Sequence, residues 1–170
     1  MEMSKRRKES LIPLSRQHHY ALLLCLRIHR GLKSHSSDLN WLQKQVQKTL
    51  QFFESDLLPH FHAEETTLFP LSLKIAESAK VTEELWKEHE EIRSRMESLR
   101  RLMTSSEMST LSESLKAFAD LLEMHIRKEE RGLFPIYEEK VTPETDREIG
   151  EKIFEQIGSA MQPTNLKLLE

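Results

Sequence analysis

The sequence predicts an all-α protein, an up-down antiparallel four-helix bundle with a short additional C-terminal helix. Five segments repeat apolar residues at helical spacing, and none shows the sustained alternation of a strand. Only 4 of the 170 residues are glycine. Charged residues make up 31% of the chain and hydrophobic residues 38%, which is typical of helices with strongly polar outer faces.

The first two helices have recognisable ends. The first is expected over about residues 15–32, because Gly31 and the polar stretch after it are typical of a helix C-terminus. Asp38 is a suitable N-cap for the second helix. Because proline lacks a backbone donor, we expect a kink at Pro59. Pro70 should end this helix, since proline pushes the preceding residue out of helical geometry.

The later helices are defined by similar signals. The third is expected over about residues 82–103, and the fourth begins at a capping box, Thr110–Glu113. Pro135 should end the fourth helix. Thr142 followed by Pro143 then indicates an N-cap and first helical residue of a shorter helix. Long helices joined by short connections favour an antiparallel bundle.

The length suits one domain with two flanking segments. We expect a mobile basic arm over residues 1–10, the bundle over residues 11–140, and a C-terminal helix and tail over residues 141–170. The tail after Pro163 should be frayed. The C-terminal helix packs on the side of the bundle or provides the contact of a homodimer.

Composition argues against several kinds of partner. A net charge of -3 points to neither nucleic acid nor a membrane surface. No apolar run approaches the roughly 20 residues of a membrane span, and the basic N-terminus lacks the apolar segment of a secretory signal. The single cysteine, Cys25, excludes a disulfide framework and favours a reducing compartment, so we expect a cytoplasmic protein.

One twelve-residue phrase occurs twice. The chain reads HFHAEETTLFPL from His60 and HIRKEERGLFPI from His125. In each copy a glutamate follows the histidine by four residues, which gives the pairs His60–Glu64 and His125–Glu129. Residues four apart share one helix face. Each pair therefore points two ligand-type groups in one direction, from the apolar stripe of its helix.

Two other helices also place a histidine on the inner stripe. His89 lies on the third helix, with Arg93 four residues later. On the first helix His18 lies opposite a face of arginines, whereas the adjacent His19 lies at the edge of the stripe with good spacing to several leucines. His18 is favoured, and His19 stays an alternative. Antiparallel order brings all these residues to one end of the bundle.

Six ligand-type groups in one core call for a cation. The predicted metal ligands are His18, His60, Glu64, His89, His125 and Glu129. A buried carboxylate without a partner is costly, and Arg93 is a single cation for two glutamates. Imidazole and carboxylate without thiolate suit iron, manganese or zinc, and a carboxylate can bridge two ions. Six groups over two metals leave open positions for a small diatomic such as O₂ or NO.

Residues beside these ligands have expected supporting roles. Glu65 and Glu130 each follow a predicted ligand, so they should support a ligand from outside or face solvent rather than bind metal directly. Phe69 and Phe134 should plug the end of the core and keep it dry.

These motifs resemble the hemerythrin-like family, the HHE cation-binding domain. The resemblance rests on QHHYAL, HFHAEETTLFP, EHEEI and HIRKEERGLFP, spread over about residues 11–140. It implies a four-helix bundle that holds two non-haem iron ions with an oxo or hydroxo bridge. By position, the resemblance implies imidazole ligands at His18 or His19, His60, His89 and His125, with bridging carboxylates at Glu64 and Glu129.

The resemblance also bears on the type of function. Oxygen-carrying members have a second histidine four residues after the one in the third helix, where this chain has Arg93. The chain therefore looks more like members that sense iron, oxygen or nitric oxide, or deliver iron, than like a carrier.

The favoured function is a non-haem di-iron protein that binds O₂ or NO for redox, nitrosative or iron sensing and homeostasis. Alternatives are an iron donor for iron–sulfur cluster repair, a slow peroxidatic enzyme and a metal-free interaction module. The ferritin-like oxidases use Glu-x-x-His, which no histidine here matches. A metal-free module leaves the buried glutamates unexplained. No catalytic residue is assigned, and a binding role is favoured over an enzymatic one.

Overall fold

The structure, a computed structural model, describes residues 7–169, and every regular element among them is helical. Its α-helices are α1 (Ile12–His35), α2 (Leu39–Phe52), α3 (Leu58–Ala63), α4 (Phe69–Ser72), α5 (Ala76–Leu102), α6 (Met108–Lys128), α7 (Phe134–Lys140) and α8 (Pro143–Ile157). Short 3₁₀ helices cover Glu9–Leu11 and Leu166–Leu169. The all-α class is confirmed.

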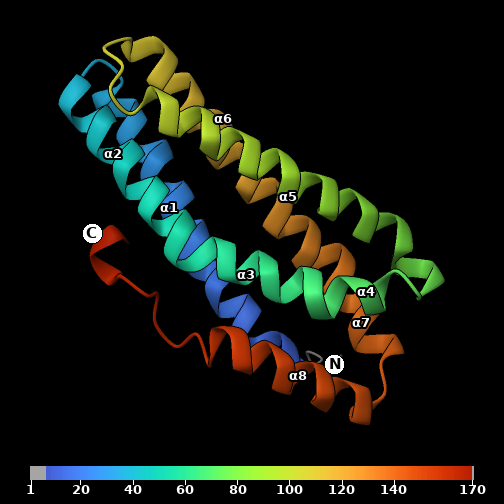
Figure 1. The fold of residues 1–170 in the computed structure, drawn as a ribbon. Helices are drawn as coiled ribbons and strands as arrows, with labels where there is room; N and C mark the ends of the chain where they lie inside the picture. The colour runs from blue at the N-terminus through green and yellow to red at the C-terminus, as the bar shows by residue number, and fades with distance from the viewer. Residues whose placement is uncertain (1–6, 170) are drawn as a thin grey trace, which may run out of the picture.

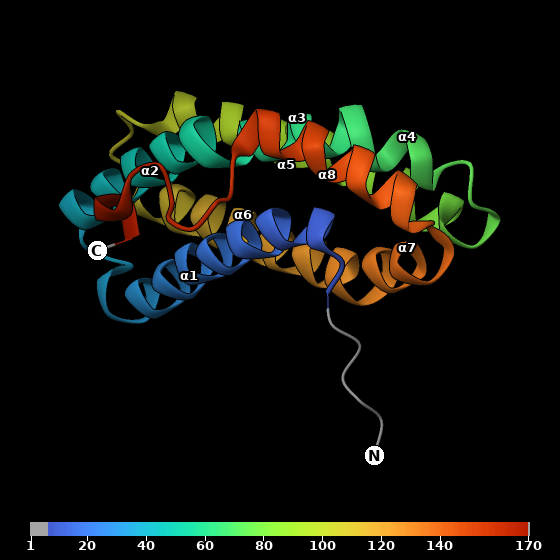
Figure 2. The ribbon, with the colours of Figure 1, turned by 90° about the horizontal axis from the view of Figure 1, so that it is seen from below.

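Four long segments form the antiparallel bundle, namely α1, α2–α4, α5 and α6–α7 (Figure 1). Both α1 and α5 pack against α6, and α2 contacts each of these three helices. The predicted additional helix, α8, packs against α3 and against the turn before α1 (Figure 2). The chain thus has the predicted bundle with its C-terminal helix folded onto it.

A turn of π-helix precedes each of three prolines. In each case the residue before the proline donates its N–H to the carbonyl five residues back. These turns are η2 (Phe53–Leu57) before Pro59, η3 (Glu64–Leu68) before Pro70 and η4 (Glu129–Leu133) before Pro135. The wider turn leaves room for the ring, and each proline lies at the start of the next α segment, where a missing N–H costs little. The prediction that Pro70 and Pro135 end their helices was therefore wrong.

The C-terminus of α1 also differs from its prediction. The helix continues through Gly31 to His35. A Cβ at Gly31 would lie 2.0 Å from the ring of Trp41 on α2. Glycine therefore permits a close approach of two helices here and does not terminate one. The predicted N-cap of α2 is confirmed, because the Asp38 carboxylate accepts the backbone N–H of Trp41 at 3.0 Å.

The starts of the later helices follow local hydrogen bonds. α5 begins at Ala76, earlier than expected, where the Ser78 hydroxyl donates to the Ser72 carbonyl at 2.7 Å. α6 begins at Met108, before the expected Thr110–Glu113 capping box, which does not form its N-cap. The Thr142 hydroxyl does cap α8, because it accepts the N–H of Thr145.

The N-terminal segment contacts the bundle over the described part. Residues 1–6 of the expected mobile arm lie outside the described residues. Arg7 pairs with Glu130 at 2.5 Å and with Glu138 at 3.1 Å, and Ser10 is buried.

The C-terminal tail is packed where fraying was expected. Leu168 and Leu169 are buried in the same apolar cluster as residues of α1 and α2. The backbone N–H of Thr164 donates to the buried Asp56 carboxylate at 2.8 Å. The burial of Leu168 and Leu169 and the backbone hydrogen bond of Thr164 thus hold the tail against the bundle.

The bundle core consists of two apolar clusters with a polar layer between them. One cluster includes Ala21 and Phe118, and the other includes Leu14 and Ile153. Along α1, for example, His18 follows Leu14 and precedes Ala21. The helices continue past Pro70 and Pro135, so the polar layer lies inside the bundle, with apolar residues on both sides. The sequence had placed these residues at one end of the bundle.

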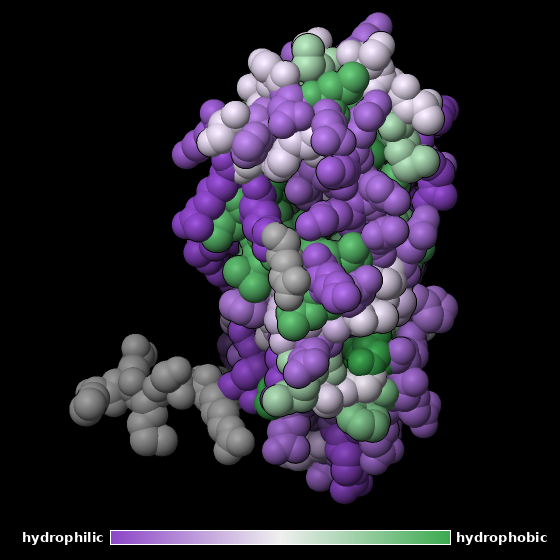
Figure 3. All heavy atoms as spheres, turned by 90° about the vertical axis from the view of Figure 1, so that its left-hand side faces the viewer, coloured by the Kyte–Doolittle hydropathy of each residue, from purple (hydrophilic) through white to green (hydrophobic). Residues whose placement is uncertain are grey.

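The outer surface shown in Figure 3 is mostly hydrophilic, with hydrophobic residues in scattered groups. Among the described residues, no helix combines the length and the apolar character that crossing a membrane requires.

Candidate metal centre

Six polar side chains meet in the buried layer, and none is more than 3% exposed. They are His18 on α1, His60 on α3, Glu64 in η3, His89 on α5, His125 on α6 and Glu129 in η4. The structure thus brings together all six residues that the sequence singled out.

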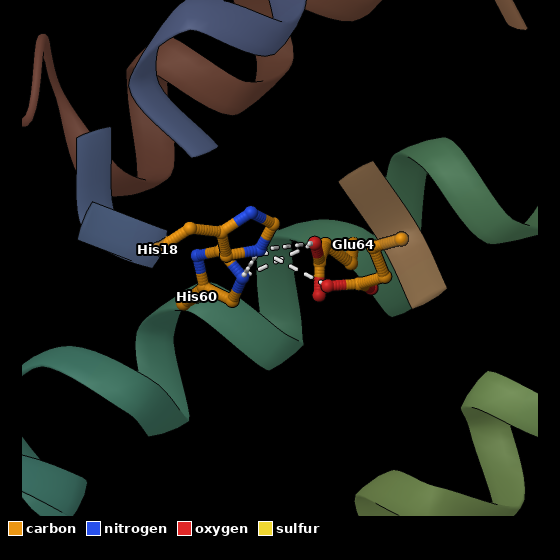
Figure 4. Close-up of side chains that lie close together, drawn as sticks. His18, His60 and Glu64 are labelled. Carbon is orange, nitrogen blue, oxygen red and sulfur yellow. Dashed lines mark hydrogen bonds and ion pairs between the residues drawn. The ribbon is translucent and has the colours of Figure 1, made fainter. Parts of the chain in front are cut away.

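The six side chains form two groups of four. In each group, one possible ligand atom per residue lies within 4.8 Å of all the others. His18 and His60 belong to one group, and Figure 4 shows both of them pointing toward Glu64. His89 and His125 belong to the other. Each copy of the repeated phrase gives its histidine to a different group, whereas both groups share the two glutamates.

Each histidine turns its Nε2 atom toward the shared carboxylates. The Nε2 atoms of His18 and His60 are 3.1 Å apart, as are those of His89 and His125. Carboxylate oxygens lie 3.1 Å from Nε2 of His60 and 3.0 Å from Nε2 of His18. The nitrogens and oxygens of four helical segments therefore converge on a small buried volume.

The other ring nitrogen, Nδ1, forms a hydrogen bond with a side-chain oxygen outside the two groups in all four histidines. The Nδ1 partners are Glu130 for His18 at 2.7 Å, Gln17 for His60 at 2.9 Å, Glu65 for His89 at 2.7 Å and Glu88 for His125 at 2.9 Å. Carboxylate and amide oxygens accept hydrogen bonds. Each Nδ1 therefore carries a hydrogen, so Nε2 is the nitrogen that can bind a metal ion at the centre when the ring is neutral.

The carboxylates shared by the two groups, those of Glu64 and Glu129, lack hydrogen-bond partners. Both carboxylates are completely buried, and none of their four oxygens has a hydrogen-bond partner of acceptable geometry. Within the described chain no arginine or lysine forms an ion pair with them. Arg93 instead pairs with Glu65 at 2.8 Å and Glu90 at 2.6 Å. Buried charges of this kind are paired or bind metals, so the donor set fits a cation between the groups.

The proton balance of the metal-free layer supports this reading. Burial alone would lower the pKa of His18, but the nearby carboxylates of Glu129 and Glu130 raise it to about 10. Burial opposes a similar rise at His89, where Glu64 and Glu65 bring the pKa to about 9. Protonated imidazoles thus neutralise the carboxylates when no metal is bound, and metal ions would displace those protons.

The model of the hemerythrin HHE cation-binding domain matches residues 13–137. The chain belongs to this family. No curated protein and no solved structure gives a significant match. In this hemerythrin domain the buried His/Glu groups are suited to a binuclear metal site.

Aromatic rings shield the hemerythrin site from water. Phe134 stacks on His18 with ring centroids 5.5 Å apart, and Phe69 stacks on His89 at 5.1 Å. Phe61 also stacks on His89, at 3.8 Å. Both Phe69 and Phe134 are completely buried, in keeping with their expected role of keeping the core dry.

The adjacent histidines of α1 have different environments. Both border a surface cavity of about 490 Å³. His18 is only 3% exposed and points into the buried layer, whereas His19 is exposed. Of the two alternatives, His18 is therefore the one placed to reach a metal in this hemerythrin domain.

Sequence reasoning missed two partners of the histidines. Gln17 and Glu88 immediately precede His18 and His89, and each reaches the histidine of a neighbouring helix. The available signal was their position, because neighbouring helix residues point about 100° apart and so toward adjacent helices. Glu65 and Glu130 had been expected to support ligands from outside or to face solvent, and both accept from a ring Nδ1.

Proposed function

We propose that this hemerythrin domain binds two non-haem iron ions and, through them, a small diatomic such as O₂ or NO, for redox, nitrosative or iron sensing and homeostasis. The sharing of the orphaned Glu64 and Glu129 by two histidine pairs carries this proposal. Two carboxylates placed between two groups are suited to bridging two cations.

In this proposal each ion has two histidines of its own. His18 and His60 would hold one ion, His89 and His125 would hold the other, and Glu64 and Glu129 would be shared by both. Nitrogen and oxygen donors without thiolate suit iron, manganese or zinc. We favour iron because a change of oxidation state at the metal would couple to the binding of a redox-active diatomic.

The number of donors favours ligand binding. Each group offers four protein ligand atoms. Non-haem iron in nitrogen and oxygen sites keeps open positions for exogenous ligands when fewer protein donors are available than its coordination number.

The surrounding residues hold the ligands and exclude water. The Nδ1 hydrogen bonds fix the ring orientations and make the Nε2 atoms better donors. Phe134 stacks on His18, and Phe61 and Phe69 stack on His89. Arg93 occupies the position of the additional histidine in the oxygen-carrying relatives and is turned to Glu65. This arrangement supports sensing or iron handling over reversible oxygen carriage.

Several finer expectations stay predictions. These are a homodimer through α8, a cytoplasmic location and a role that does not depend on catalysis. The exposed Phe154 of α8, at 59% exposure, is available for the homodimer contact.

The test is anaerobic reconstitution with Fe(II), followed by oxidation. We expect two irons per chain and near-ultraviolet absorption that the metal-free protein lacks. His18→Ala should lower the iron content and weaken this absorption, whereas His19→Ala should retain both. Failure to take up iron, or equal iron content in the two variants, would contradict the proposal.

A further inference from the structure

The two halves of the site correspond residue by residue. The pair Gln17–His18 on α1 occupies the same relation to the centre as Glu88–His89 on α5. The two copies of the repeated phrase correspond in the same way. In each half, the residue before one histidine accepts a hydrogen bond from Nδ1 of the other histidine. The halves can therefore be compared position by position.

One supporting residue breaks this correspondence. Nδ1 of His125 donates to the Glu88 carboxylate at 2.9 Å, whereas Nδ1 of His60 donates to the amide oxygen of Gln17 at 2.9 Å. The two hydrogen bonds have the same length, so the geometry is the same in both halves. The acceptor, however, is charged in one half and neutral in the other. Three of the four imidazoles thus donate their Nδ1 hydrogen to a carboxylate, and one donates it to a neutral amide.

Each of the three carboxylates is itself held by a cation. Arg93 pairs with Glu65 at 2.8 Å, Arg7 pairs with Glu130 at 2.5 Å, and Lys128 pairs with Glu88. These cations are about 28–29% exposed, so they are partly screened by solvent. They keep the carboxylates in place beside the imidazoles and do not cancel the hydrogen bonds that the carboxylates accept.

A carboxylate supports a metal-binding imidazole better than an amide does. Hydrogen bonds to an ionised acceptor are roughly twice as strong as neutral ones. They also make the opposite ring nitrogen more basic, and loss of such a partner typically costs 10- to 100-fold in metal affinity. The group with two carboxylate-supported imidazoles, His89 and His125, should therefore hold its ion more tightly.

The two halves of the site also differ in how close their histidines lie to the surface. His18 lines the cavity of about 490 Å³ together with Arg7, Ser15 and Glu130. His89 is 0% exposed and is stacked against both Phe61 and Phe69. Phe134 also stacks on His18, so the difference lies in exposure: His18 borders the cavity and is 3% exposed, whereas His89 stacks on two rings and is 0% exposed.

We propose that the site is asymmetric by construction: the ion between His89 and His125 is retained, and the ion between His18 and His60 is the exchangeable one. Gln17 is the residue that sets this difference. The inference rests on the proposed function, and it names which half of the centre releases or accepts iron.

The direct test is the location of a single equivalent of metal. Crystals of metal-free protein are grown with one equivalent of Fe(II) per chain under anaerobic conditions, and anomalous scattering at the iron edge gives the occupancy of each half. A 10- to 100-fold difference in affinity would give about three- to tenfold higher occupancy between His89 and His125, because one equivalent of metal is shared by the two halves. Equal occupancy, or higher occupancy between His18 and His60, would overturn the inference.

Matched variants test the role of Gln17. Gln17→Glu should bring the two occupancies close together and should turn a two-phase release of iron to a chelator into a single phase. Glu88→Gln should also equalise the halves, by weakening the retained one. Two-phase release that is unchanged in Gln17→Glu would refute the role of this residue. Absence of iron from both halves would instead refute the proposed function itself.

Discussion

Glu64 and Glu129 come from the two copies of one repeated phrase, and each offers an oxygen to both pairs of histidines. The two residues also begin π turns, η3 and η4, at equivalent places in their helices. Single π turns inside α-helices are frequent at functional sites. Each π turn thus accommodates the proline that follows it, and its first residue is the glutamate that faces the candidate metal centre.

Removal of one shared carboxylate should reduce metal binding. Glu129→Gln keeps the shape and loses the charge, so we expect fewer than two metal ions per chain. The gain in thermal stability on metal addition should fall as well, since a ligand at 100 times its Kd stabilises the folded state by about 2.7 kcal/mol. Metal content and melting curves measure both effects. Glu123→Gln, at a half-buried position of α6 where the side chain pairs with Arg127 and not with the centre, is the control and should keep the full gain.

Metal-free protein should lose stability in alkaline solution. The pKa of His18 is raised to about 10 and that of His89 to about 9, from an ordinary value of 6.5. A pKa raised by folding adds stability that is fully present below pH 6.5 and is lost as pH rises through 9 to 10. Bound metal removes these protons. Melting temperatures from pH 6 to 10 should therefore fall more steeply without metal than with it, and parallel curves would contradict this charge balance.

Gly31→Ala should destabilise the protein through a clash. The added Cβ would lie 2.0 Å from the Trp41 ring, and overpacking of this kind typically costs about 1–3 kcal/mol. In a Trp41→Ala background the same change should instead stabilise by up to about 1 kcal/mol, because alanine is the better helix former. Denaturant unfolding of the four proteins measures the reversal of sign. A stabilising effect in both backgrounds would show that Trp41 moves aside freely.

The packed tail should contribute to global stability. Leu168 is 6% exposed and Leu166 is 52% exposed, although both belong to the last 3₁₀ helix. Leu168→Ala should cost about 2 kcal/mol, the lower end for a buried leucine. Leu166→Ala should change the free energy of unfolding by about 0.5 kcal/mol or less. Equal effects of the two substitutions would mean that the tail is detached in solution.

Residues related by helical spacing could be predicted from sequence. His60 with Glu64, and His125 with Glu129, follow from a spacing of four on a helix, and this spacing is independent of the rest of the fold. The bundle class follows from the same periodicity. The sequence favours His18 over His19 without excluding His19, because the two are adjacent: His18 lies opposite the arginine face, and His19 lies at the edge of the stripe with good spacing to several leucines. The packing of α1 decides between them.

Features that depend on other helices could not be predicted in this way. The sequence predicts a helix end at Gly31, and this prediction fails because the glycine instead permits the close approach of Trp41 from another helix. The predicted helix end at Pro70 fails because the rule assumes α winding, whereas η3 is a wider π turn. Gln17 and Glu88 act on histidines of neighbouring helices, and their partners become visible only when the helices are packed.

The most direct test of the paired site is the metal content per chain of protein isolated from its native host, measured by elemental analysis. We predict two metal ions per chain, with iron the main element, and a loss of both in the Glu64→Gln/Glu129→Gln double variant. Native protein without bound metal, or a double variant that keeps both ions, would contradict the claim that these two glutamates bridge a binuclear centre.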